Sequence, residues 1–135
     1  KMYTAKEASL LSPGLLAYIG DSVFEVMVRE HLLKKGFRKL QEIHQKTVAI
    51  VNATSQAKLV ALLEDCLSPA EKDIVRRGRN SRTGKIPDNV DMIDYRWSTG
   101  FEALIGFLYL SDQRERLAEI WDNIIRAIEE REKEK

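Results

Sequence analysis

The chain carries, from position 18 to position 25, the stretch Tyr18-Ile19-Gly20-Asp21-Ser22-Val23-Phe24-Glu25. Its apolar residues recur at helical spacing around a glycine and an acid. Glycine inside a helix costs about 1 kcal/mol relative to alanine, and it is tolerated where another group must approach the backbone closely. We therefore expect a close contact at Gly20, directly beside the carboxylate of Asp21.

The helix around this stretch has clear start and stop signals. Ser12-Pro13 is typical of an N-cap followed by proline at the first helical position. An apolar stripe continues to about Lys35, and Gly36 provides a C-terminal stop.

The rest of the chain also shows helical rather than alternating periodicity. We predict helices over about 40–51, about 54–66, from Ser68-Pro69 to near Gly78, from Tyr95 or Ser98 to Leu110, and from near Asp112 onward. Residues 79 to 94 lack periodicity and indicate a long loop. The prediction is one all-α domain of five to seven helices over residues 1–135, with a core at about 10–125 and a frayed tail at 129–135.

Composition excludes several classes of protein. Cys66 is the only cysteine, so an internal disulfide is impossible, and with His31 and His44 it makes a poor zinc site. The start lacks the apolar core of a signal peptide, and no apolar run is long enough to span a bilayer. We expect a soluble, cytoplasmic protein with no membrane partner.

Basic residues cluster although the net charge is only +1. One segment contains five cations without an acid among them, and glycines and small donors lie between them. Such a segment suits a phosphate backbone, and the absence of interleaved aromatics favours a duplex over a stacked single strand. The alternative is a solvated loop. The candidate RNA-binding residues are Arg76, Arg77, Arg79, Asn80, Arg82 and Lys85.

Two acids in apolar helical segments are candidate metal ligands. Asp21 is one and Glu102, in Phe101-Glu102-Ala103-Leu104-Ile105-Gly106, is the other. An ionised carboxylate near a core is costly unless it is paired or bound to a metal. Each has an alternative: Asp21 meets an arginine or faces solvent, and Glu102 forms a capping box with Thr99. Together they are suitable parts of a Mg²⁺ site for phosphodiester hydrolysis.

The two motifs, Tyr18 to Glu25 and Phe101 to Gly106, resemble the signature helix and the second acidic motif of the ribonuclease III family. The resemblance covers about residues 10–125. It implies an all-helical homodimer whose paired sites cut the two strands of double-stranded RNA. It also implies that Asp21 and Glu102 are the catalytic, metal-binding acids, that Mg²⁺ is the cofactor, and that Mn²⁺ substitutes for it.

Two further segments, Arg77-Gly78-Arg79-Asn80 and Tyr95-Arg96-Trp97-Ser98-Thr99, are similar to the Mini-ribonuclease III branch of the family. The chain also ends where other members continue into a double-stranded-RNA-binding domain. This resemblance implies that the substrate is precursor large-subunit ribosomal RNA and that the basic segment supplies much of the affinity.

The chain departs from the family pattern at two positions. Ala17 stands four residues before Asp21 and Thr99 three residues before Glu102, where family members usually carry acids. Glu25 and Asp94 are candidates to complete the site. Two other functions stay open: a non-catalytic RNA-binding helical dimer, and a helical interaction module with no role in nucleic-acid binding.

Overall fold

The structure is a computed structural model that describes residues 2–81 and 86–133. Within these ranges the regular structure is entirely helical, as the sequence predicts. The elements are α1 (Ala5–Ser9), α2 (Pro13–Lys34), α3 (Leu40–Val51), α4 (Ala53–Leu63), the 3₁₀ turn η1 (Glu64–Cys66), α5 (Pro69–Asn80), α6 (Met92–Leu110) and α7 (Arg114–Lys133).

The predicted caps of α2 and α5 are confirmed. The Ser12 hydroxyl accepts a hydrogen bond from the Leu15 amide, and Gly36 takes the left-handed φ of 104° after α2. Ser68 and Glu71 form a reciprocal capping box at the start of α5.

Two helix starts differ from the sequence prediction. α6 begins at Met92, earlier than expected, because the Asp91 side chain accepts from the amides of Ile93 and Asp94. α1 was not predicted; Thr4 and Glu7 form its capping box.

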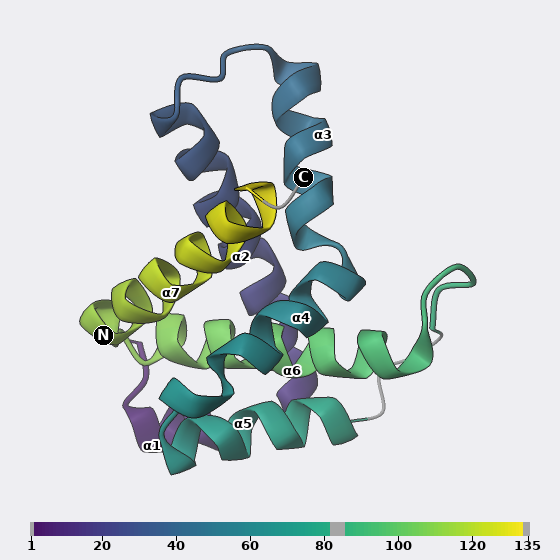
Figure 1. The fold of residues 1–135 in the computed structure, drawn as a ribbon. Helices are drawn as coiled ribbons and strands as arrows, with labels where there is room; N and C mark the ends of the chain where they lie inside the picture. The colour runs from purple at the N-terminus through teal and green to yellow at the C-terminus, as the bar shows by residue number, and fades with distance from the viewer. Residues whose placement is uncertain (1, 82–85, 134–135) are drawn as a thin grey trace.

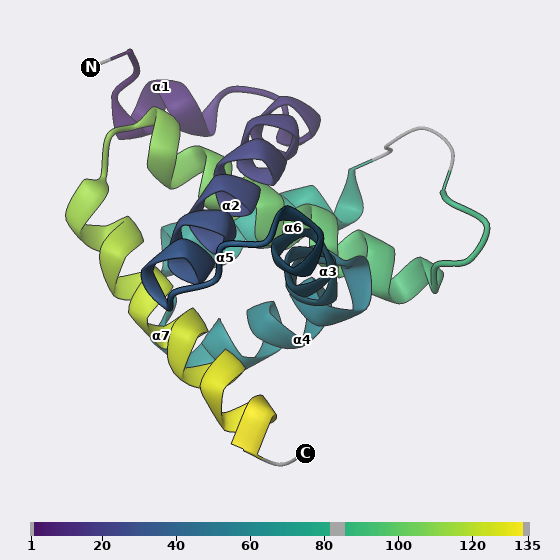
Figure 2. The same cartoon turned by 90° about the horizontal axis from the view of Figure 1, so that it is seen from above.

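Helix α6 forms the centre of the molecule. Figure 1 shows α2 crossing α6 steeply and α5 running along its other side, and the view in Figure 2 shows α3 and α4 beside the same crossing. Ten residues of α6 are buried, so this helix is apolar around most of its circumference. A functional group on α6 is therefore fixed by several helices at once.

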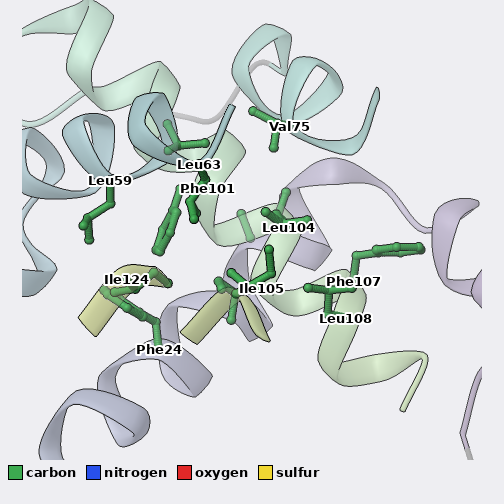
Figure 3. Packing of buried hydrophobic residues seen from close by; sticks show 14 of the residues in the cluster. Phe24, Leu59, Leu63, Val75, Phe101, Leu104, Ile105, Phe107, Leu108 and Ile124 are labelled. Atoms are coloured by element: carbon green, nitrogen blue, oxygen red, sulfur yellow. The ribbon is translucent and has the colours of Figure 1, made fainter. Parts of the chain in front are cut away.

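The core surrounds α6, as Figure 3 shows. Leu59 and Leu63 of α4, Val75 of α5, Phe24 of α2 and Ile124 of α7 pack against its buried face. No helix of the described residues is long and apolar enough to cross a membrane.

The C-terminal helix α7 extends to Lys133, into the segment 129–135 for which the sequence predicts fraying. The fraying of this segment stays a prediction. Two contacts hold its last turns: Arg131 donates to the Ser55 hydroxyl at 3.0 Å, and Glu132 lies 3.8 Å from the Lys35 ammonium. Residues 134–135 lie outside the described residues.

Candidate active site

The crossing of α2 and α6 is made by two glycines. A Cβ added to Gly20 would lie 1.7 Å from the backbone oxygen of Glu102, and a Cβ added to Gly106 would lie 1.9 Å from that of Leu16. Real Cβ atoms never approach a backbone oxygen so closely, so both positions require glycine. The close contact expected at Gly20 is present, and it brings Asp21 next to Glu102.

An aromatic pair supports this crossing from the core side. The rings of Phe24 and Phe101 meet edge to face with centroids 4.8 Å apart, and both are fully buried. Phe101 directly precedes Glu102, and Phe24 lies one turn after Asp21. The backbones that carry the two acids are therefore anchored by packing rather than by loops.

The crossing places the two carboxyl groups close enough to influence one another. Burial raises the pKa of Glu102 to about 8, and Asp21 adds to the rise through its negative charge and through a hydrogen bond between the side chains. Asp21 is exposed whereas Glu102 is half-buried. Without a cation, the Glu102 carboxyl therefore retains its proton near neutral pH.

The structure excludes one alternative for each acid, whereas the exposure of Asp21 agrees with the alternative in which it faces solvent. Thr99 and Glu102 lie inside α6 rather than at its start, and the Thr99 hydroxyl donates to the Tyr95 carbonyl, so Glu102 does not cap its helix. In the part of the chain that is described, no basic side chain pairs with Asp21 or Glu102.

The two candidate additional acids are engaged elsewhere or not clustered with the pair. Glu25 forms an ion pair with Arg29 at 2.9 Å. Asp94 lines a separate hollow with Trp97 and Lys58. Over residues 2–81 and 86–133, no group of three or more acids, histidines or cysteines is placed to hold a metal. The described acidic shell consists of Asp21 and Glu102.

Gln56 of α4 is a further site residue that sequence reasoning missed. Its side chain is buried, with 1% exposed, and it lowers the pKa of Glu102, opposing the effect of Asp21. Its Nε2 has no hydrogen-bond partner within the described residues. The sequence contains a signal: Gln56 lies one and two turns before Leu59 and Leu63, on the inward face of the helix.

The basic residues of α5 lie beside α6 because this contact also depends on glycines. A Cβ on Gly100 would lie 2.6 Å from the backbone oxygen of Val75, and one on Gly78 would lie 2.8 Å from the Gly100 Cα. The C-terminal half of α5 therefore contacts α6 one turn or less from Glu102.

The predicted RNA-binding residues have unequal surroundings. Arg76 is exposed and pairs with Asp73 one turn earlier on α5. Arg77 is half-buried and donates to the Ser9 carbonyl at 2.7 Å, so it also fastens α1. Asn80 is exposed at the end of α5. Arg82 and Lys85 lie outside the described residues.

Arg79 is stacked rather than fully solvated. Its guanidinium lies 4.8 Å from the centroid of the Trp97 ring, and its buried Nε has no hydrogen-bond partner in the described ranges. An aromatic ring therefore meets one arginine in space, although none lies between the arginines in the sequence.

Comparisons with known proteins show the family of this chain. The family model of the Ribonuclease III domain matches residues 15–113. The Mini-ribonuclease 3 of Symbiobacterium thermophilum is 44% identical over 110 residues, which cover 82% of this chain and 85% of the relative. The Mini-ribonuclease 3 of a Thermoanaerobacter species is 41% identical over 130 residues, covering 96% and 92%.

A solved structure has the same fold. The crystal structure of a Fusobacterium nucleatum protein superposes with a TM-score of 0.78 at 27% identity, covering 87% of this chain and 94% of that one. The family match spans both acidic motifs and the helices that bring them together. The chain therefore belongs to the ribonuclease III family of endoribonucleases that cut double-stranded RNA, and it is similar to the Mini-ribonuclease 3 members of that family.

Proposed function

We propose that cleavage by this protein depends on a divalent metal held by Asp21 and Glu102, with Mg²⁺ as the cofactor and Mn²⁺ as a substitute. The observation that carries the proposal is the close crossing of α2 and α6 at Gly20 and Glu102, which brings the two carboxyl groups together. No described basic group neutralises them.

The donor set fits such a cation. Two adjacent carboxylates repel each other when both are ionised, and this repulsion contributes to the raised pKa of Glu102. A divalent cation between them would replace the proton and remove the repulsion. Mg²⁺ prefers oxygen ligands and keeps several waters, so two protein carboxylates are sufficient.

Each residue then has a distinct task in hydrolysis. When bound, the cation supplies an activated water and offsets negative charge on the phosphate. Glu102 is the anchored ligand, because Phe101 and the glycine crossing fix its backbone. Asp21 is exposed, so its carboxylate is accessible from the side on which a substrate phosphate can approach.

The substrate that we propose is a double-stranded stalk in precursor large-subunit ribosomal RNA, as the resemblance to Mini-ribonuclease III implies. Arg76, Arg77, Arg79 and Asn80 would contact its backbone from the end of α5, together with Arg82 and Lys85. Cations on a helix that packs beside Glu102 are suited to hold phosphates near the acids.

We also propose that the protein acts as a homodimer with one site per strand. The α2 helix has an apolar face that is not covered within the chain: Leu15 is 56% exposed, Tyr18 75% and Val26 53%. These positions fall on one side of the helix. A second copy would bury this side and set two Asp21–Glu102 pairs against one duplex. Tyr18→Glu should then yield monomers in light scattering.

The metal dependence is tested with a long RNA duplex in Mg²⁺ or in chelator. We expect cutting only with Mg²⁺, and we expect Asp21→Asn and Glu102→Gln each to abolish cutting while duplex binding persists. Glu25→Gln is the matched control, since Glu25 lies on the same helix but pairs with Arg29. Binding without cutting by the wild type would indicate a non-catalytic RNA-binding dimer. Near-normal turnover of Asp21→Asn in Mg²⁺ would exclude Asp21 as a ligand.

A transcript that forms the stalk of the ribosomal precursor tests the substrate. We expect it to be cut at few positions and faster than an unrelated duplex of equal length. Equal rates on both would remove the ribosomal assignment but not the metal site.

A further inference from the structure

The buried amide of Gln56 is the one polar group of the site that has no task in the account above. It lies on the inward face of α4, where Leu59, Val60 and Leu63 are apolar and buried like it. An amide in such a position loses its water, and it must find a partner to recover that cost.

The partner available to Gln56 is Glu102. The amide lowers the pKa of Glu102, as a hydrogen-bond donor beside the carboxyl group does when it favours the ionised form. Its Nε2 nevertheless has no hydrogen-bond partner within the described residues. The buried donor is therefore unsatisfied, on the face of α4 that packs against α6, the helix that carries Glu102.

We propose that Gln56 is a positioning residue, which donates a hydrogen bond from its side-chain amide to the ionised Glu102 carboxylate and so orients this ligand toward the metal. The inference rests on the proposed metal site. Partners that orient a ligand through a hydrogen bond are a general feature of metal sites, because a fixed ligand loses less freedom when the metal binds.

A neutral donor suits this particular site. Within the described residues no third acid joins Asp21 and Glu102, and the hydroxyl of the nearby Thr99 is directed to the Tyr95 carbonyl. With two described acids only, each ligand must be well oriented. The amide of Gln56 can orient Glu102 without adding a further negative charge to the pair.

The test measures Mn²⁺ binding to the full chain without RNA, by electron paramagnetic resonance of the free ion. Gln56→Met and Gln56→Leu remove the donor and replace the amide side chain with an apolar one of similar size. We expect the dissociation constant for Mn²⁺ to rise about tenfold or more. The melting temperature in chelator should stay the same or rise, because an unsatisfied buried amide has been removed.

Ser55→Ala is the matched control. Ser55 is the neighbouring residue, is also buried, and accepts its hydrogen bond from Arg131 on α7 rather than facing the acids. We expect its Mn²⁺ affinity to equal that of the wild type. In cleavage assays, the Gln56 variants should need more Mg²⁺ for half-maximal rate, whereas their affinity for duplex RNA in chelator should be unchanged.

Wild-type Mn²⁺ affinity in both Gln56 variants would overturn the proposal. Loss of folding in both, or equal weakening in Ser55→Ala, would assign Gln56 a structural role and overturn it as well. Failure of the metal site itself has a different signature: Asp21→Asn would then bind Mn²⁺ as tightly as the wild type, or neither would bind it.

Discussion

The Cα of Gly20 faces the backbone carbonyl of Glu102 so closely that a Cβ at Gly20 would lie 1.7 Å from the Glu102 oxygen. Asp21 directly follows this glycine in the chain, and Glu102 is the residue whose backbone Gly20 contacts. The helix crossing that builds the core thus also brings the two acids together. Folding and assembly of the site depend on the same backbone contact.

Gly20→Ala should be strongly destabilising. Neither backbone can move without disturbing the crossing, so we expect a loss of about 3 kcal/mol or more in the free energy of unfolding, measured with urea. Gly14→Ala in the same helix is the control, because nothing lies within 4 Å of its added Cβ. That variant should be neutral or up to about 1 kcal/mol more stable. Equal stabilities for the two variants would contradict the importance of the crossing.

The sequence predicted Gly20 as a point of close approach but not the group that approaches it. Glycine is unfavourable inside a helix, so its presence at position 20 is a signal that the sequence alone reveals. The residue that approaches it is defined only by how α2 and α6 cross. Gln56 illustrates the same limit. Its place on an inward helical face was readable, but a lone polar residue there has many possible partners until α4 is placed against α6.

The predicted start of α6 was wrong because several aspartates in the preceding segment could each have capped the helix. Asp88, Asp91 and Asp94 follow one another at intervals of three, and with Pro87 they fall in the segment 79–94 for which the sequence predicts a loop. The structure uses Asp91 as an N-cap and includes Asp94 in the first turn of α6. Spacing alone could not decide which of the three aspartates caps the helix.

The raised pKa of Glu102 predicts a specific pH dependence in chelator. Its folded-state pKa of about 8 lies above the ordinary value of 4.5. Between these values the folded protein holds a proton that the unfolded chain releases, so stability falls as the pH rises. We expect the melting temperature of the wild type to decline from about pH 5 to about pH 8 more steeply than that of Glu102→Gln.

Mn²⁺ should bind more tightly, and stabilise the protein more, as the pH rises. Because the metal competes with the proton on Glu102, its affinity should increase with pH until the carboxyl is ionised. Thermal shifts with and without Mn²⁺ across the same pH range measure both effects. Parallel pH curves for the wild type and Glu102→Gln in chelator would show that Glu102 titrates normally.

Arg76 and Arg77 are expected to separate RNA affinity from stability. Both replacements by alanine should weaken duplex binding at low salt and reduce the slope of log affinity against log salt by about 1 each. Only Arg77→Ala should also lower stability, by about 2 kcal/mol, because Arg77 donates a charged hydrogen bond to the Ser9 carbonyl of α1. Unchanged affinity at low salt for both variants would remove this part of α5 from the RNA-binding surface.

The ion pair between Glu71 and Arg116 fastens the start of α5 to α7 and should be costly to break. Both Glu71 oxygens accept hydrogen bonds from Arg116 at 2.8 Å, and Arg116 also donates to the Cys66 carbonyl at 2.6 Å. Burial alone would raise the pKa of Glu71, but the hydrogen bonds from Arg116 and Ser68 outweigh it and lower the pKa. This stabilisation is present above the ordinary pKa of the carboxyl and is lost as the pH falls through the lowered one.

Arg116→Met should therefore cost about 3 kcal/mol near neutral pH, because it leaves a buried carboxylate unpaired, and less near pH 4, where Glu71 in the variant can take up a proton. Urea unfolding at the two pH values measures the difference. Arg114→Met is the matched control, since its partner Asp112 lies at the same 2.8 Å but the arginine is 88% exposed. An exposed pair contributes at most about 1 kcal/mol, so equal losses in the two variants would show that the burial of Glu71 is not what makes this contact strong.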